Sequence, residues 1–339
     1  MRINYDSINT RELSAALGWR NGDGVMRTLV FGAGPLGSLY AHRLVQAGKD
    51  VTLIARGQRY DWIQANGLAL VDEMTGTKEE SSTHVVDELR PEDEYDLVIV
   101  LIRKNKLPPV LEVLAANARI KNILFMGNNA LGFKAYLDAL PEAKLLFGFP
   151  GAGGGMSEHV VHYADREKAS GKRKPVTIGE LDGRTRDRTQ AIKSLFETAR
   201  IPVDLTEDID GWLKYHMALV SPLVNALYKH DCDNYALAKD KATMRAMVRA
   251  AKEGGRVLHD LGYTKRQPFQ FNLFYWLPEI LNVKAIEGLL GSKFAEIAFA
   301  RHARAARDEF GELADEFQSL VEQTSVATPN INLLRGYVD

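Results

Sequence analysis

Short apolar runs alternate with amphipathic stretches through the first half of the chain. The runs that predict strands are Thr28–Phe31, Asp50–Ala55, Leu68–Val71, Asp96–Ile102 and Asn122–Met126. Between the first two, the periodicity of Leu36–Gln46 indicates an amphipathic helix. The continuous apolar run that ends at Ile102 is typical of a strand buried on both faces. Strands that alternate with helices in this way predict an α/β fold with a parallel, doubly wound sheet.

Between about Glu142 and Val203 the alternation of strands and helices becomes less regular. After Val203 the pattern is helical to the end of the chain. The looser part predicts strands at Leu145–Phe149, Val160–Tyr163 and Pro175–Gly179, with a flexible loop at Gly151–Gly155. Long periodic segments follow at Ile209–Tyr228, Lys239–Leu261 and Ser292–Gln323. In the last segment, Phe310, Leu313, Phe317 and Leu320 are three or four residues apart. That spacing places them in one apolar stripe of a helix.

Three regions follow from these patterns. Met26 directly precedes the first strand, so residues 1–25 are expected to be an N-terminal extension. Residues 26–204 predict a Rossmann-type nucleotide-binding domain, and residues 205–339 predict an all-helical domain. The cleft between two such domains is the expected ligand site. The apolar stripes of the helical part could form a core or a homodimer interface.

Composition narrows the classes of function. The chain has 339 residues and a formal net charge of -1, which argues against a nucleic-acid-binding protein that works by bulk charge. Its one cysteine, Cys232, excludes an intramolecular disulfide and a metal site built from several cysteines. The sequence also lacks a long apolar membrane span and a secretory signal. Composition therefore predicts a protein of a reducing, cytoplasmic compartment that does not act on nucleic acid, membrane or metal.

A glycine-rich loop follows the first predicted strand and opens the first predicted helix. It reads Gly32-Ala33-Gly34-Pro35-Leu36-Gly37, which fits the G-x-G-x-x-G dinucleotide-binding pattern. Gly32 permits a tight turn, Gly34 lets a pyrophosphate approach the backbone, and Gly37 allows close packing of helix and strand. The helix N-terminus then faces the anion. The alternative is a glycine-rich turn that binds no ligand.

The end of the second predicted strand indicates which cofactor is preferred. Sites specific for NAD usually carry an acidic residue there, which binds the ribose 2′-hydroxyl. This chain instead has Arg56, followed by Arg59, and no acidic residue between Val51 and Arg59. Because a guanidinium group forms charge-assisted bonds with a phosphate, NADP(H) is expected. The alternative is that Arg56 is only a solvated loop residue.

Further short motifs follow along the chain. Ile63–Leu68 reads I-Q-A-N-G-L, Asn129–Gly132 reads N-A-L-G, Trp212–Lys214 reads W-L-K, and Leu334 comes five residues after Pro329. Together with the glycine loop and the strand that leads to Arg103, these motifs resemble the ketopantoate reductases (2-dehydropantoate 2-reductases). The resemblance runs from about Arg27 to the C-terminus.

The resemblance implies a chemistry and assigns roles. NADPH would deliver a hydride to the ketone carbon of a 2-oxo acid, a lysine would protonate the ketone oxygen, and a glutamate would hold the lysine. These roles would fall on Lys214 and Glu309, with Asn129 positioning the reacting groups and contacting the cofactor. Arg103 stands where the family usually has a lysine, and it is expected to contact the cofactor. Glu309 lies 20 residues before Pro329, and its neighbours Asp308 and Glu312 compete for the same role.

Helical spacing adds candidate substrate contacts beside Lys214. Ser221 and Asn225 are seven and eleven residues further on, so they share a helix face with the lysine. A cation in a closed cleft can stabilise the developing alkoxide and donate a proton, and burial can lower the pKa of a lysine. The alternatives are an ordinary surface lysine and, for Asn225, a polar residue that ends the turn after Pro222.

The chain also departs from the family pattern. Ala218 and Pro222 stand where the family usually has asparagines, and Ile297 and Ala298 stand where it has a serine that contacts substrate. Four cationic donors follow closely: Arg301, His302, Arg304 and Arg307. One of them could bind a substrate carboxylate, or the arginines could form a solvated basic face.

The expected function is therefore NADPH-dependent reduction of a 2-oxo acid, with ketopantoate to pantoate as the leading reaction. The departures keep two alternatives open. One is a related reductase of another oxo acid or an imine, and the other is a non-catalytic NADP-binding sensor.

Overall fold

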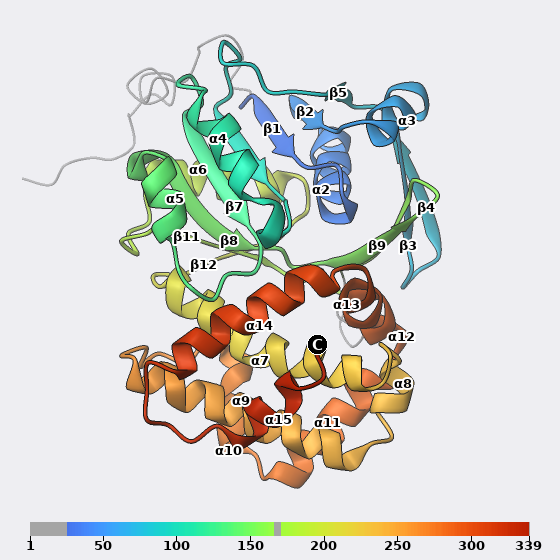
Figure 1. Ribbon diagram of the computed structural model, residues 1–339. Coiled ribbons are helices and arrows are strands. Elements are labelled where there is room, and N and C mark those ends of the chain that lie inside the picture. The colour runs from blue at the N-terminus through green and yellow to red at the C-terminus, as the bar shows by residue number, and fades with distance from the viewer. Residues whose placement is uncertain (1–25, 166–170, 339) are drawn as a thin grey trace, which may run out of the picture.

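The computed structural model describes residues 26–165 and 171–338, which form a sheet-containing half and a helical half (Figure 1). The N-terminal extension predicted for residues 1–25 lies outside the described residues. The main sheet has the strand order β12-β11-β8-β7-β6-β1-β2-β5. In that order the strands are Val203–Leu205, Val176–Gly179, Leu145–Phe149, Asn122–Met126, Leu97–Val100, Thr28–Phe31, Val51–Ile54 and His84–Val86.

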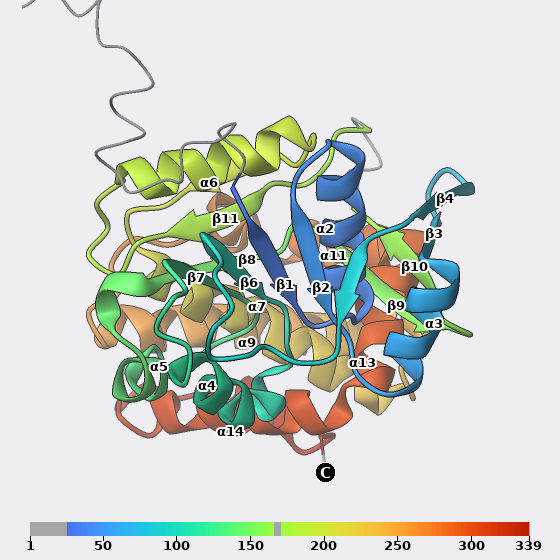
Figure 2. The same ribbon diagram turned by 90° about the horizontal axis from the view of Figure 1, so that it is seen from above.

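All neighbouring strands of this sheet are parallel except β8 and β11. Helices cover both faces, with α2 and α6 on one side and α4 and α5 on the other (Figure 2). Their bounds are Pro35–Gln46, Asp187–Thr198, Pro108–Ala115 and Lys134–Ala139, respectively. Strand β1 shows why both faces need cover: Val30 packs toward α2 and α6, while Leu29 and Phe31 pack toward α4 and α5. The predicted α/β fold is confirmed.

A second, smaller sheet has the order β4-β3-β10-β9. Its strands are Thr77–Ser81, Leu68–Asp72, Val160–Ala164 and Gly153–Ser157. The strand predicted at Leu68–Val71 is confirmed as β3, but it belongs to this sheet, and β5 takes its place in the main one. The flexible loop expected at Gly151–Gly155 was wrong from Gly153 onward. Gly153–Ser157 is a strand because β10 pairs with it along its whole length, which glycine content alone does not reveal.

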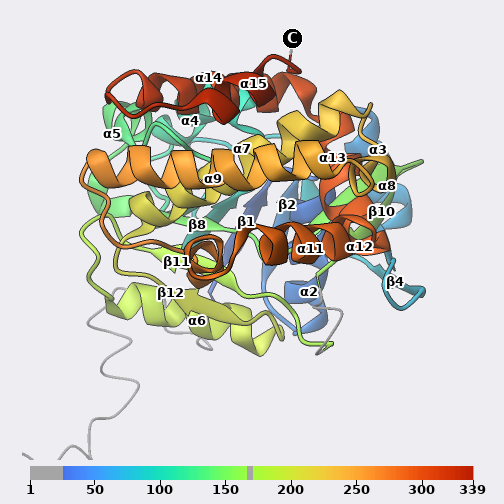
Figure 3. The same cartoon turned by 90° about the horizontal axis from the view of Figure 1, so that it is seen from below.

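The helical half begins with α7, Ile209–Lys229, directly after β12. Its other α-helices are α8 (Asn234–Leu237), α9 (Lys241–Asp260), α10 (Leu273–Trp276), α11 (Glu279–Leu290), α12 (Lys293–Ala295), α13 (Arg301–Ala305), α14 (Arg307–Val321) and α15 (Pro329–Arg335). Helix α9 crosses the underside of this half (Figure 3). Within the described ranges, no helix is both long and apolar enough to cross a membrane. The remaining elements are α3 (Gln58–Asn66), three 3-10 turns, η1 (Lys104–Lys106), η2 (Glu142–Lys144) and η3 (Phe269–Asn272), and a π-helical turn, η4 (Glu296–Ala300).

The long helix expected over Ser292–Gln323 is interrupted. It is divided into α12, η4, α13 and α14, and Ala306 has non-helical dihedrals, with φ at -129°. The two parts pack on different partners: Ala298 lies against Gly153 of β9, while α14 packs on α7. The predicted apolar stripe of α14 is confirmed, because Phe310, Leu313, Phe317 and Leu320 are all buried.

Candidate active site

The predicted site residues of the sheet-containing half follow neighbouring strands. The glycine loop follows β1, Arg56 follows β2, Arg103 follows β6 and Asn129 follows β7. These strands are adjacent and parallel in the order β7-β6-β1-β2. Their carboxyl ends therefore meet at one edge of the sheet, where ligands bind in open α/β folds. Helix α14 runs along the boundary with the helical half beside this edge (Figure 1).

The glycine loop has the backbone geometry that a dinucleotide requires. Gly32 has a φ of +115°, and a Cβ on Gly37 would lie 1.7 Å from the carbonyl oxygen of Gly32. A Cβ on Gly34, by contrast, would meet no atom of the described chain within 4 Å. Gly34 precedes α2, whose first turn has no side-chain cap. Open space before an uncapped helix N-terminus fits a phosphate group.

The two arginines after β2 have different environments. Arg59 donates hydrogen bonds to Ala33 O at 3.2 Å, Ser38 Oγ at 3.0 Å and His159 O at 2.7 Å, so it braces the glycine loop. Arg56 is exposed, and its side chain makes no hydrogen bond or ion pair with any described residue. Arg56 is therefore the guanidinium group that remains available to a cofactor phosphate.

Lys214 lies in the second turn of α7 and is almost completely buried, with 3% of its surface exposed. Its Nζ forms an ion pair with Asp210 one turn earlier, and it lies 4.9 Å from the ring centre of Tyr263. A Cβ on Gly132 would lie 3.2 Å from the same Nζ. Burial lowers the pKa of Lys214, although the charges of Asp210 and Asp208 oppose that shift. The helical half thus delivers a buried cation to the Asn129–Gly132 turn.

The side chain of Asn129 forms hydrogen bonds within its own turn and with a second lysine, Lys104. Its Nδ2 donates to Gly132 O at 2.8 Å, and its Oδ1 accepts from Lys104 Nζ at 3.1 Å. Lys104 Nζ also lies 3.4 Å from Glu316 Oε1. These contacts place Lys104, rather than Arg103, beside Asn129.

Glu309 is the buried acid among the three candidates on α14, since Asp308 and Glu312 are exposed. Its Oε1 accepts a hydrogen bond from the backbone N–H of Lys104 at 3.1 Å. Its Oε2 is buried and has no hydrogen-bond partner among the described residues. Burial raises the pKa of Glu309. The structure brings Glu309 to the ends of β6 and β7, but in the described chain its carboxylate does not contact Lys214.

Arg103 points toward the helical half. It lies 3.5 Å from Asp308, which also accepts a hydrogen bond from Asn105 Nδ2 at 2.6 Å and lies 3.4 Å from Lys106 Nζ. Arg103 therefore joins a partly exposed set of polar contacts across the domain boundary. Its predicted role in cofactor binding stays a prediction.

Ser221 and Asn225 lie further along α7, and both are buried. Neither side chain makes a hydrogen bond within residues 26–165 and 171–338. A buried amide without a protein partner is open to a ligand or water. Ala218, between Lys214 and Ser221 on α7, instead packs in the core beside Gly254 and Phe317.

The arginines before Glu309 have protein partners. Arg301 pairs with Glu296 at 2.7 Å, Arg304 donates to Asp231 O at 3.3 Å, and Arg307 donates to Tyr337 O at 3.2 Å. Burial lowers the pKa of His302 to about 4, so its ring is neutral near pH 7. These contacts favour structural roles for the three arginines. Nowhere among the described residues do histidine, cysteine, aspartate and glutamate side chains gather as a metal ion would require.

Sequence reasoning missed several residues at this site. Lys104 is one residue beyond the predicted Arg103. Asp210 lies four residues before Lys214, and Glu316 lies seven after Glu309, so helical spacing could have found both. Asn128 lines the cavity at the ends of β6 and β7, and its buried Oδ1 has no partner in the described chain. Tyr263 comes from a distant loop, which only the fold reveals.

Comparison with known proteins identifies related sequences. Residues 28–182 match the family model described as ketopantoate reductase PanE/ApbA. A 2-dehydropantoate 2-reductase of Nostoc sp. is 26% identical over 292 residues, covering 76% of this chain and 86% of that enzyme. A Mesorhizobium japonicum enzyme of the same name is 34% identical, but over 93 residues that cover 26% of this chain and 27% of that enzyme.

Solved structures with the same fold are more distant in sequence. A 2-dehydropantoate 2-reductase of Geobacter metallireducens superimposes with a TM-score of 0.75 at 15% identity, covering 92% of this chain and 98% of that one. A D-mandelate dehydrogenase in a ternary structure with NADH and anilino(oxo)acetate gives 0.70 at 16% identity, with 92% and 96% covered. At these identities the likeness establishes the fold alone.

Proposed function

The chain belongs to the ketopantoate reductase PanE/ApbA family of oxidoreductases, and we propose that it reduces a 2-oxo acid to a 2-hydroxy acid with NADPH. The observation that carries this proposal is the convergence of two sites at one sheet edge. A glycine loop with open space before a helix N-terminus lies on one side, and the buried Lys214 lies on the other.

The cofactor site is built from backbone and one exposed cation. The loop Gly32–Gly37 and the start of α2 would hold the pyrophosphate, and Arg56 would hold the 2′-phosphate of the adenine ribose. NADPH supplies the hydride when it is bound. Related structures support a nicotinamide cofactor, since the D-mandelate dehydrogenase was solved with NADH. The preference for NADPH rests on Arg56 and on the lack of an acidic residue beside it.

Lys214 is the proposed proton donor. When the ketone carbon is reduced, negative charge develops on its oxygen, and a cation in a water-poor site stabilises that charge strongly. Lys214 can then transfer a proton from Nζ to this oxygen. Burial lowers its pKa, which favours proton release near neutral pH.

The surrounding polar groups would orient the substrate. Lys104 of η1 is a second cation beside Asn129 and suits the substrate carboxylate. Its contacts with Asn129 and Glu316 fix its position. Asn225 and Ser221, further along α7, offer buried polar groups that have no partner among the described residues. Glu309 lies beside Lys104, and its buried Oε2, which has no hydrogen-bond partner among the described residues, can accept a hydroxyl hydrogen bond.

Ketopantoate is the leading substrate because the curated relatives carry that activity in their names. A specific observation favours a second candidate, another 2-oxo acid. Ala218 and Ile297 stand at positions where the family resemblance expects polar substrate contacts, and both are buried in apolar surroundings. A 2-oxo acid with fewer polar groups than ketopantoate would not need the contacts that these two positions lack.

Turnover of a panel of 2-oxo acids tests the proposal. The panel contains ketopantoate, pyruvate, 2-oxoisovalerate and phenylglyoxylate, and the loss of NADPH absorbance at about 340 nm is followed. We expect NADPH-dependent reduction of at least one member. Tight NADPH binding without turnover of any member would instead favour an NADP-binding sensor.

A further inference from the structure

We propose that Asp210, held by Tyr263, is a positioning residue that keeps Lys214 aimed at the Asn129–Gly132 turn and returns its proton from solvent. This inference rests on the proposed role of Lys214. It assigns the carboxylate partner of the lysine to α7 itself rather than to Glu309 on α14. Neither Asp210 nor Tyr263 belongs to the motifs that carry the family resemblance.

The contacts around Asp210 use both of its carboxylate oxygens. Oδ1 accepts a hydrogen bond from Lys214 Nζ, and Oδ2 accepts one from Tyr263 Oη at 2.7 Å. The hydroxyl of Tyr215, on the same helix, donates a hydrogen bond to Tyr263 O at 2.6 Å. This bond holds the loop that carries Tyr263 against α7. Asp210 is therefore fixed in one orientation, and it fixes the ammonium group in turn.

Exposure gives Asp210 a second role. The Lys214 side chain is 4% exposed, whereas that of Asp210 is 32% exposed. The lysine therefore reaches water through its partner. When Lys214 transfers a proton to the substrate oxygen, an N–H bond breaks and an O–H bond forms, leaving a neutral amine. A proton taken up by Asp210 from water can then pass to that amine, which restores both groups.

Four groups set the charge of Lys214. Asp210 and Asp208 at the start of α7 favour the protonated form, and Lys104 of η1 opposes it. The Tyr263 ring lies over the ammonium group and adds a favourable cation–π contact. Burial favours the neutral amine. Removing the charge of Asp210 leaves the effects of burial and Lys104 opposed by Asp208 and by the Tyr263 ring.

The first experiment measures Lys214 without any turnover. The pH dependence of its acetylation by acetic anhydride is followed by peptide mass spectrometry in the full-length protein. In Asp210→Asn, we expect the half-maximal labelling pH of Lys214 to fall by about 1 unit or more, because a neighbouring opposite charge shifts a pKa by about that amount. An unchanged labelling profile would overturn the proposal.

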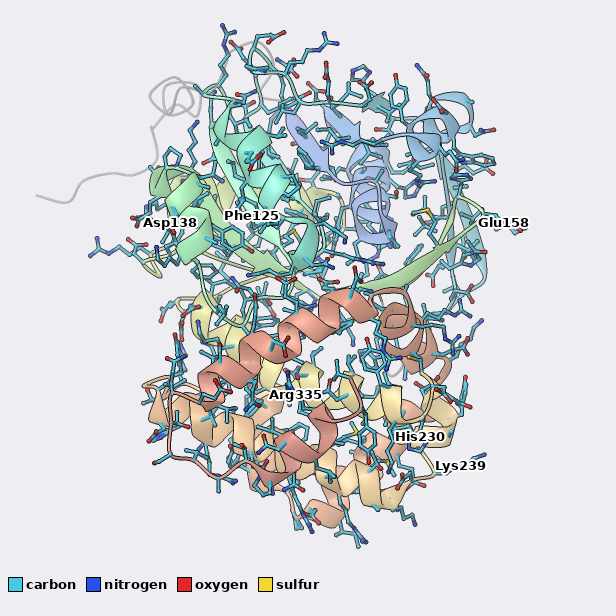
Figure 4. The ribbon with its side chains drawn as sticks, viewed as in Figure 1. Phe125, Asp138, Glu158, His230, Lys239 and Arg335 are labelled. Atoms are coloured by element: carbon cyan, nitrogen blue, oxygen red, sulfur yellow. The ribbon has the colours of Figure 1, made fainter. Side chains whose placement is uncertain are left out.

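The chain offers a matched control for this substitution. Asp138 forms an exposed ion pair with Lys134 four residues earlier, on the outer side of the sheet-containing half (Figure 4). Asp138→Asn removes the same kind of i, i+4 pair away from the site. It should leave Lys214 labelling unchanged.

The second experiment uses the pH profile of kcat. Reduction requires protonated Lys214, so the rate falls as pH rises through its pKa, and Asp210→Asn should move this fall to lower pH by about 1 unit. Asp210→Glu should restore most of the wild-type profile. A profile that does not move, in a folded variant, contradicts the proposal.

A double variant tests the part played by Tyr263. If Tyr263 acts through Asp210, Tyr263→Phe lowers kcat several-fold alone but adds nothing to Asp210→Asn. Independent, additive losses would contradict this assignment. If Asp210→Asn folds poorly, Asp210→Ala takes its place in the double variant, since it also removes the carboxylate. If the wild type reduces no 2-oxo acid, the proposed function fails, while the labelling result still decides whether Asp210 controls Lys214.

Discussion

The two ends of the candidate site are built in different ways. The cofactor end consists mainly of backbone, with one glycine loop and an exposed Arg56. The reacting end consists of buried and partly buried side chains from several segments. Among them are Lys214 of α7, Glu316 of α14 and the partly buried Lys104 of η1. A backbone site depends on a few consecutive residues, whereas a side-chain site depends on how distant elements pack. The difference predicts that substitutions at one end change binding and substitutions at the other change chemistry.

The largest expected effect is at the reacting end. Lys214→Ala should lower kcat about 1,000-fold, within the range of roughly 10²–10⁴ for loss of a general acid. The dissociation constant for NADPH, measured by fluorescence titration, should stay within about twofold of the wild-type value. Lys239→Ala is the control, since this exposed lysine lies at the far edge of the helical half (Figure 4). Equal losses in both variants would contradict a special role for Lys214.

An intermediate effect is expected at the cofactor end. Arg56→Ala should weaken NADPH binding by about 10- to 100-fold, because hydrogen bonds between charged groups contribute roughly 1.5–3 kcal/mol. Binding of NADH serves as the internal control, since it lacks the 2′-phosphate, and it should not change. Fluorescence titration of wild type and variant with each cofactor measures the two changes in affinity. If the two affinities fall together, or neither falls, the assignment of Arg56 is wrong.

A smaller effect is expected from the support of Lys104. Glu316→Gln should lower kcat/KM about tenfold, because Lys104 loses the charge that holds it beside Asn129 and a hydrogen bond of this kind contributes about 1.5 kcal/mol. The amide can still accept from the Ala130 N–H. Glu312→Gln, on the same helix but exposed, is the matched control and should behave as wild type. Steady-state kinetics on the best 2-oxo acid compares the two variants.

The same contrast explains what the sequence could predict. The glycine loop, Arg56 and Lys214 were found because each stands in a local pattern next to a recognisable strand or motif. Asp210 and Glu316 were within reach, since helical spacing connects them to Lys214 and Glu309. Tyr263 was not, because the loop after α9 meets α7 only in the folded chain.

The fold shows the same limit. The parallel pairing of β1, β2, β6 and β7 follows from alternating apolar runs and helices, and it is confirmed. Their order in the sheet is a result of the structure. The second sheet was missed because its members are far apart in the sequence: β3 ends at Asp72, and its partner β10 begins at Val160. The break at Ala306 was missed because apolar periodicity continues on both sides of it.

The most direct test of the account is a single-turnover measurement on protein already loaded with NADPH. Wild-type and Lys214→Ala proteins are each mixed rapidly with the 2-oxo acid that the panel identifies, and NADPH absorbance is followed. We predict that both variants bind NADPH equally and that the oxidation rate is about 1,000-fold lower in Lys214→Ala. Equal oxidation rates, or a variant that no longer binds NADPH, would contradict the division between a binding end and a reacting end.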